Sequence, residues 1–542
     1  MLLTDTLEEL RACVEARRID AGISKLETLR SDFENLRPSD PTVGAAASCL
    51  AQWVDLGFEG ESALRALIGR FDVESRRSLP LTQYVHLRLA EGLLAMRAEE
   101  LHTAFGHLDS VLALAKETNE PNLALAATLW KARCLRKAGE YAQALEVTRE
   151  GMALATTLGL HPIRAVMQTL ESWMVFQNGD SKEAIRILQA AECVLRHSDD
   201  FITMGNIHSA YGRIALREGR YDHALQHFEA SIEYFDRRAS LQGYRARTLT
   251  NIAQAKRFLA LQLRRSIDAR WERQRRSSNG DGRVSARDKA GQLERMHELL
   301  RKAQEDLTDA ATIYEKTQNH HGAGNAAVYL AQIYLDLGNL EKAEAKAAEA
   351  FELGATKADY LLMCRARIVQ ALVANARFEE EIGGGEDPSR YAQLAHDCAK
   401  EAIDLGERTE SRRLLAQANI CRGLTLVNGF FNDAEAARAC CNRAESFLGH
   451  DRHDALWQEI DLLRERILHG GLEDPNLRAW SQGSVGDKSL QEVVSEFEEL
   501  LIRKVWEHEG RKVSRVAQRL AVSPKKVRRV LRHLGVLVTE PE

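Results

Sequence analysis

The chain has 542 residues and is slightly acidic, with 74 Lys and Arg against 79 Asp and Glu. This length suits several ordinary domains or one elongated array, and 44% hydrophobic with 28% charged residues is typical of a folded, soluble protein. No window approaches the run of apolar residues that a membrane helix needs, and the first residues lack the basic and apolar regions of a signal peptide. We therefore expect a cytoplasmic protein that makes no contact with a membrane.

Charge is distributed unevenly along the chain. Residues 511–542 contain nine basic and two acidic residues, so residues 1–510 contain 65 basic and 77 acidic ones. This asymmetry indicates two parts with different partners, and a basic tail is a common feature of nucleic-acid-binding proteins.

Enzyme and metal signatures are missing from the sequence. The nine cysteines are scattered without a C-x-x-C pair, so we expect reduced core thiols and no metal. The glycines of EEEIGGGEDPSR, residues 379–390, are not followed by the Gly-Lys-Ser/Thr of a phosphate loop. No G-x-S-x-G or H-E-x-x-H motif occurs either. We therefore expect a non-enzyme with no catalytic residues and no cofactor.

In chain order, residues 1–90 are helical by pattern, and we interpret them as N-terminal helical pairs that cap an array. Residues 91–263 and 290–469 carry an internal repeat of Gly, an aromatic residue or Leu two positions later, and Ala five positions later. The copies are AGEYAQAL, NGDSKEAI, EGRYDHAL, LGNLEKAE and NGFFNDAE, with Ala144, Ala184, Ala224, Ala343 and Ala434 as the small residue. The first three copies are 40 residues apart, and Ala104 continues the register one period earlier with Glu99 in place of the glycine.

The repeat has a simple physical interpretation. The Gly ends one helix in a left-handed turn, and the aromatic residue or Leu starts the next helix and packs back on the first. The Ala lets the two helices approach closely. Each pair leaves an apolar face that only a neighbouring pair can cover, so the pairs stack into a superhelix.

This pattern resembles the tetratricopeptide repeat. In that resemblance the alanines match the small residue of the second helix, and Gly212, next to Tyr211, matches the small position of the first. The period is longer than the usual ~34 residues, as in the helical-repeat domains of large bacterial transcription activators. The resemblance implies an all-α, tetratricopeptide-like α-solenoid whose groove binds a protein, a peptide or a small ligand.

Two segments interrupt the helical pattern. Residues 264–289 are basic and contain Ser-Ser-Asn-Gly-Asp-Gly, which predicts a flexible loop insertion, with a second nucleic-acid surface as the alternative. Residues 470–488 are rich in Gly, Pro and Ser and predict a linker.

The last predicted domain, residues 489–538, reads as three helices. Apolar residues recur at spacings of three and four from Leu490 to Val505, which indicates an amphipathic first helix. Ser514 can cap a short second helix. Ser523 can cap a third, with Pro524 in its first turn. In that helix the apolar residues share one side, and Lys525, Arg529 and Arg532 point away from it, which suits a DNA major groove.

This domain resembles the Fis-type helix-turn-helix over about residues 497–536. Gly510, Ala517 and Leu520 match family positions, but Ala521 replaces the usual turn glycine, a change that costs little if its φ is negative. Pro524-Lys525-Lys526 also replaces the usual Arg-x-Thr. The resemblance implies a homodimer through the first helix, for which Phe497, Leu501 and Val505 are the interface candidates.

We therefore predict a DNA-binding transcriptional regulator whose array binds a protein or other ligand. The candidates for contact with base edges are Lys525, Lys526 and Arg529, and the candidates for phosphate are Arg511, Lys512, Ser523, Arg528 and Arg532. The alternative is an interaction scaffold whose basic tail binds an acidic protein or binds nucleic acid non-specifically. Trp506 is expected in the core rather than in base stacking.

Overall fold

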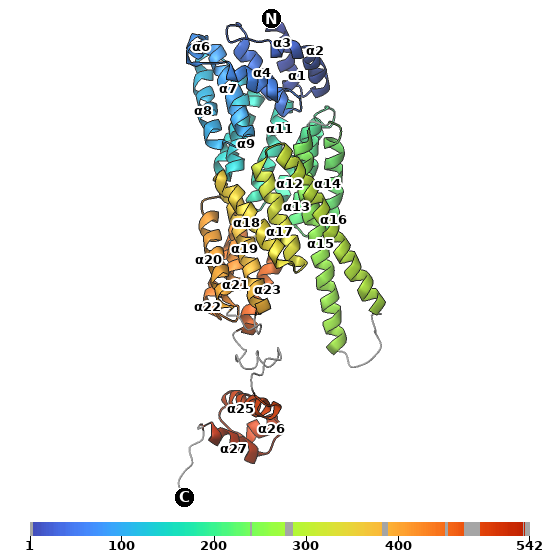
Figure 1. The fold of residues 1–542 in the computed structure, drawn as a ribbon, viewed down its shortest axis with the longest axis vertical. Helices are drawn as coiled ribbons and strands as arrows, with labels where there is room; N and C mark the ends of the chain where they lie inside the picture. The colour runs from blue at the N-terminus through green and yellow to red at the C-terminus, as the bar shows by residue number, and fades with distance from the viewer. Residues whose placement is uncertain are drawn as a thin grey trace. The chain divides into compact units, whose positions relative to one another are not determined.

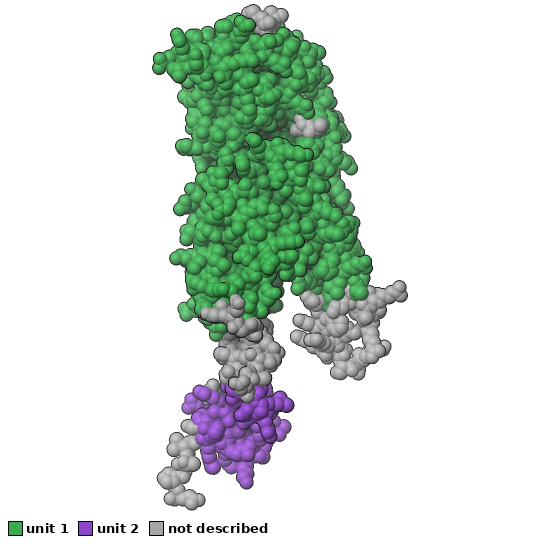
Figure 2. Space-filling view, viewed as in Figure 1, with its two compact units in different colours: residues 1–381, 387–465 green, residues 382–386, 466–542 purple. Residues whose placement is uncertain are grey.

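The structure, a computed structural model, is built from α-helices (Figure 1). It describes residues 4–238, 241–276, 286–381, 388–449, 454–470, 488–534 and 536. Within these ranges no β-strand occurs, as the sequence predicts. The chain divides into two compact units (Figure 2), one of residues 1–381 and 387–465 and the other of residues 382–386 and 466–542.

Helices of the first unit follow one another along the chain with short turns. It opens with α1 (Thr4–Glu15), α2 (Ile19–Thr28), α3 (Arg30–Glu34), α4 (Val43–Asp55), α5 (Glu61–Gly69) and α6 (Val73–Ser78). The helix pairs are then α7 (Leu81–Arg97) with α8 (Leu101–Glu117), α9 (Pro121–Ala138) with α10 (Tyr141–Thr157), α11 (His161–Gln177) with α12 (Ser181–Leu195), α13 (Phe201–Arg217) with α14 (Tyr221–Phe235), α15 (Gln242–Arg276) with α16 (Ala286–Lys316), α17 (His320–Asp336) with α18 (Leu340–Thr356), α19 (Tyr360–Glu381) with α20 (Ser389–Gly406), and α21 (Arg412–Leu426) with α22 (Ala434–Leu448), followed by α23 (Leu456–Gly470). The second unit contains α25 (Leu490–His508), α26 (Val513–Arg519) and α27 (Pro524–His533).

The repeat motif produces the predicted turn and the predicted close packing. Gly139, Gly179, Gly219 and Gly338 have φ of 88°, 94°, 74° and 75°, in the left-handed region that glycine adopts without strain. The alanine of each copy is the fourth residue of the second helix, and it is fully buried at Ala104, Ala144, Ala184, Ala224 and Ala343. The small residue predicted in the first helix, Gly212, is packed equally tightly. A Cβ on Gly212 would come within 2.5 Å of the Phe228 ring.

The last copy departs from the predicted register. Gly429 does not have a positive φ; Asn432, with φ of 46°, takes the left-handed conformation instead. Asp433 then caps α22 by accepting a hydrogen bond from the Ala436 amide at 2.9 Å. Because α22 begins three residues later than the motif predicts, the fully buried alanine is Ala437 and the assignment to Ala434 is wrong.

The expected loop at residues 264–289 is also shorter than predicted. Helix α15 continues to Arg276 and α16 begins at Ala286. The segment between Arg264 and Arg276 has no Gly or Pro, so its sequence does not interrupt a helix. Residues 277–285, which hold the Ser-Ser-Asn-Gly-Asp-Gly stretch, lie outside the described residues, as do residues 471–487 of the predicted linker.

The first helices of successive pairs form the inner side of the array. Helices α7, α9, α11, α13, α15, α17, α19 and α21 each contact the next in this series, whereas the second helices make no comparable contacts with one another. Closer spacing along one side of a stack is what curvature requires, so the row of first helices lines the concave side.

The array turns back on itself, and carboxylates from distant repeats cap helix N-termini at the contacts. The Asp199 carboxylate accepts hydrogen bonds from the Ile19 and Asp20 amides at the start of α2, both at 2.6 Å. Glu410 accepts one from the Ala142 amide of α10 at 2.6 Å. Glu99 accepts one from the His321 amide of α17 at 3.0 Å. The amides of a first helical turn have no partner inside the helix, and the helix dipole favours negative charge there.

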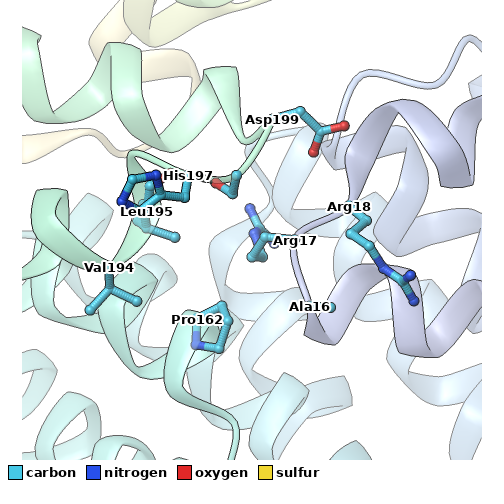
Figure 3. A pocket seen from close by; sticks show the side chains of 9 residues that line it. Ala16, Arg17, Arg18, Pro162, Val194, Leu195, His197 and Asp199 are labelled. Atoms are coloured by element: carbon cyan, nitrogen blue, oxygen red, sulfur yellow. Dashed lines mark hydrogen bonds between the residues drawn. The ribbon is translucent and has the colours of Figure 1, made fainter.

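Buried ion pairs also join distant parts of the array. Arg17 lies between α1 and α2, and its Nε is 2.7 Å from Oδ2 of the fully buried Asp200, which precedes α13. The Asp454 carboxylate accepts a hydrogen bond from Arg413 Nε at 2.9 Å, and its Oδ2 lies 3.7 Å from Arg217 Nε. A pocket between the α1–α2 turn and Pro162, Val194 and His197 (Figure 3) is also lined by Arg17 and therefore belongs to this contact.

We expect the Arg17–Asp200 pair to make the closed array sensitive to acid. Burial raises the pKa of Asp200, but attraction and hydrogen bonding from Arg17 outweigh it, so this pKa lies below its usual range. The stabilisation is then present above the unfolded pKa of ~3.9 and is lost as the pH falls through the folded pKa. Asp200→Asn retains a capping side chain but leaves Arg17 without its anion, which should cost ~3–5 kcal/mol at neutral pH.

Chemical unfolding of the full chain between pH 3 and 7 measures this effect. The difference between the parent and Asp200→Asn should be largest at neutral pH and should shrink on acidification. Asp222→Asn, on the exposed side of α14, is the matched control and should change little at any pH. A difference that stays constant with pH would contradict the assignment.

Candidate nucleic-acid interface and inner face of the array

The second unit is a three-helix domain with a small core of its own. Ile502 and Trp506 of α25 pack on Val516 of α26 and on Val527 and Leu531 of α27, and all five side chains are buried. Trp506 is thus a core residue, as the sequence predicts, and it is not available for base stacking.

Local capping sets the start of the third helix. The Ser523 hydroxyl accepts a hydrogen bond from the Lys526 amide at 3.2 Å, and Pro524 occupies the first turn, where a missing N–H costs nothing. The second helix differs from the prediction: α26 begins at Val513 with Lys512 at its N-cap, so Ser514 lies inside the helix and does not cap it. Ser523 is therefore committed to α27 through its hydroxyl.

A basic face covers the exposed side of α26 and α27. Its side chains are exposed, and none has a carboxylate within ion-pair distance among the described residues: Arg511, Lys512, Arg515, Lys525, Arg528, Arg529 and Arg532. The structure thus brings together Lys525 and Arg529 with the predicted phosphate candidates Arg511, Lys512, Arg528 and Arg532. It adds Arg515, which lies in the same basic run of the sequence but was not among the predicted contacts.

Lys526 differs from its neighbours in this structure. Its ammonium is 2.6 Å from the Glu498 carboxylate of α25, and the side chain is only partly exposed. Arg519 is similarly paired with Glu509 at 2.5 Å. These two cations are held by acidic residues of α25 and its end, so Lys525 and Arg529 are the stronger candidates for base contacts.

Helix α25 carries an exposed apolar stripe. Leu490, Val494, Phe497 and Leu501 are 80%, 48%, 44% and 39% exposed. Their spacing of four, three and four is that of one side of a coiled coil. Val505 is instead half-buried against the core of the second unit, so Leu490 and Val494 extend the predicted stripe in its place.

The turn between α26 and α27 is strained at one residue. Ala521 has φ of 50°, so the condition under which an alanine costs little here, a negative φ, is not met, and the residue occupies the left-handed conformation that favours glycine. Gly510, with φ of 63°, takes the same conformation without cost after α25.

The inner face of the first unit is the second candidate site. The 40-residue period places Arg133, Trp173 and Arg213 at one position of α9, α11 and α13, and the Arg213 guanidinium lies 3.9 Å from the centre of the Trp173 ring. These residues are not among the predicted site residues. Their recurrence at the repeat period is visible in the sequence, but the sequence does not indicate which side of the helices they occupy.

Comparisons with known proteins find similar solved structures only at low sequence identity. No protein-family model and no curated protein matches the sequence. Similar solved structures include apo NprR, a quorum sensor from B. thuringiensis, with 14% identity, 64% of this chain, 97% of that chain and a TM-score of 0.39. NprR in complex with its cognate peptide NprX has 14% identity, 73% and 98% coverage and a TM-score of 0.45. The human IFIT1 dimer with PPP-AAAA has 14% identity, 87% and 96% coverage and a TM-score of 0.38.

The chain is an all-α protein with a tetratricopeptide-like α-solenoid, and at these identities the likeness concerns that fold alone. No described helix is long and apolar enough to cross a membrane. Within the described ranges no group of three or more His, Cys, Asp or Glu side chains is placed to hold a metal ion.

We expect Ala521→Gly to stabilise the second unit by up to ~1 kcal/mol. An alanine in the left-handed conformation costs ~1–2 kcal/mol, which glycine avoids. Glycine also loses more conformational freedom on folding, and this offsets ~0.5–1 kcal/mol of the stabilisation. Ala521 is exposed, so no packing is lost. Hydrogen exchange of the α26 and α27 amides in the full chain measures the effect as slower opening. Ala517→Gly, a buried helical position, is the control and should speed exchange; faster exchange in Ala521→Gly as well would refute the strained turn.

Proposed function

We propose that the chain is a transcription regulator that binds double-stranded DNA through α26 and α27 and binds a protein, peptide or other ligand on the inner face of its array. The observation that carries the proposal is the basic face of the second unit, in which seven exposed cations lack carboxylate partners among the described residues. Unpaired surface cations on a short capped helix are suited to phosphates and base edges.

Charge also supports a definite orientation on DNA. Among the described residues of the second unit, the acidic side chains lie on α25 and at its end, where Glu498 and Glu499 lie next to Lys526 and His533. DNA is repelled from that side and attracted to the basic face. The N-terminal half of α27, with Lys525 and Arg529, then reaches the major groove, while Arg511, Lys512, Arg528 and Arg532 hold the flanking phosphates.

The double change Lys525→Ala with Arg529→Ala tests this function in the full chain. We expect the loss of ~1–3 kcal/mol for each base contact on a site selected from random DNA, with relaxed sequence preference. A side chain that contacts only phosphate would instead weaken binding to all sequences alike and lower the salt slope by about one. Fluorescence anisotropy on selected and random DNA at several salt concentrations separates these two roles.

A matched control removes the same amount of charge elsewhere in the second unit. Lys526→Ala with Arg519→Ala deletes two cations that carboxylates already hold, so it should weaken DNA binding less. If both double variants bind DNA as the parent does, α27 is not a recognition helix, and the scaffold with a basic tail becomes the better description.

We also propose that the second unit pairs as a homodimer through the exposed stripe of α25. Four apolar side chains on one side of a solvated helix are suited to a second copy of the same helix. Phe497→Glu with Leu501→Glu should convert the dimer to a monomer, as measured by analytical ultracentrifugation. A dimer would bind half-sites about one helical turn apart, so the variant should also lose its preference for such paired sites.

Two glutamates introduced beside the stripe, rather than within it, provide the control. Gln491→Glu with Ser495→Glu adds the same charge at exposed positions outside the stripe and should leave the dimer intact. A parent chain that is monomeric at high concentration would defeat the pairing.

A further inference from the structure

Three arginines on the inner face of the first unit lack compensating charge. Arg136 of α9, Arg213 of α13 and Arg247 of α15 are half-buried, and none has a carboxylate within ion-pair distance in the part of the chain that the structure describes. Two neighbouring arginines are paired: Arg133 lies 2.9 Å from Asp55, and Arg257 lies 2.5 Å from Asp336. Arg365 of α19 and Arg422 of α21 have no such partner either, but the charges of Arg136, Arg213 and Arg247 act on one another. We call these three residues the arginine cluster.

Few protein groups satisfy the donors of the arginine cluster. Arg213 stacks on the Trp173 ring, and its Nε is buried with no protein hydrogen-bond partner. Arg247 donates one hydrogen bond to the amide oxygen of Asn206, while its Nε is likewise buried without a partner. A guanidinium has five N–H donors in a planar fork, so each of these side chains keeps unused hydrogen-bonding capacity.

The charges of the arginine cluster act on one another. Burial lowers the pKa of Arg136 to about 10, and Arg247 is the strongest charge that adds to this effect. Burial also lowers the pKa of Arg213, followed by repulsion from Arg247 and Arg136. The nearby tyrosines Tyr141 and Tyr244 act in the opposite direction and raise the pKa of Arg136. Three helices thus direct positive charge to one region.

This region is enclosed by the closing contacts of the array. The Glu410 amide donates to the carbonyl oxygen of Gly139 at 3.1 Å, which places the end of α9, only three residues after Arg136, next to the start of α21. Access is limited but present, because each arginine retains part of its exposed surface. Such a place suits a small ligand better than a folded protein.

A buried cation without an anion is costly, and a bound anion removes that cost. Guanidinium groups hold phosphates and carboxylates through paired, charge-assisted hydrogen bonds. We propose that Arg136, Arg213 and Arg247 form a binding site for a small ligand that carries two or more negative charges, as phosphate or carboxylate groups. This site would bind the ligand of the array in the proposed regulator. It rests on the ligand-binding part of the proposed function and is independent of DNA binding.

Calorimetric titration of the full chain tests the site with two probes. Pyrophosphate represents clustered phosphates and citrate represents clustered carboxylates, with acetate as the singly charged reference. The titrations are made with Lys525→Ala and Arg529→Ala present, so that the basic face of the second unit contributes less to phosphate binding. We expect one probe to bind with a stoichiometry of one and to raise the midpoint of thermal unfolding. The probe that binds identifies the group, and the absence of binding by both would overturn the proposal.

Substitutions locate the binding to the arginine cluster. Arg213→Met and Arg247→Met should each weaken the affinity ~10- to 100-fold, as expected for charged hydrogen bonds. Each should also leave the unliganded chain as stable as the parent or more stable, because a buried unpaired charge is removed.

Arg257→Met, on the same helix as Arg247, is the matched control. It breaks a satisfied ion pair, so it should lower the unfolding midpoint of the unliganded chain and leave the affinity unchanged. Affinity that is insensitive to Arg213→Met and Arg247→Met would overturn the site. The DNA-binding assay on the parent chain is a separate readout: a chain that binds the probe but no DNA retains the anion site and loses the proposed regulatory role.

Discussion

Capping of helix N-termini by carboxylates from distant repeats is the interaction on which the first unit depends. Stacked helix pairs contact only their neighbours, so stacking alone leaves an open array. Asp199, Glu410 and Glu99 supply acceptors to the first turns of α2, α10 and α17, across 180, 268 and 222 residues of sequence. Each capped turn has amides that its own helix cannot satisfy. The same hydrogen bonds therefore complete a helix and close the array.

Glu99 is part of a repeat turn and also makes one of the contacts that close the array. It occupies the position where later repeats have glycine and adopts φ of 60°, which is unfavourable for a residue with a side chain. Its carboxylate binds the His321 amide and lies 3.8 Å from Lys137. The strain in the turn is thus offset by contacts that a glycine cannot make.

The sequence was sufficient for the local elements and insufficient for the contacts between them. Gly139 and Ala144 predicted a turn and a buried crossing because both requirements act within a few residues. The same motif failed at Ala434, because a longer connection shifts the start of α22 by three residues. Arg17 and Asp200 are 183 residues apart, and no local pattern links them. In the second unit the pattern predicted the basic face of α27, but the pairing of Lys526 with Glu498 depends on the packing of α25.

Closure also determines the order in which the array can form. Helix pairs such as α13–α14 assemble from residues close in sequence, whereas the hydrogen bond between Glu410 and Ala142 requires a loop of 268 residues to close. The closing contacts should therefore form after the helix pairs, and they set the pace at which the first unit reaches its final fold.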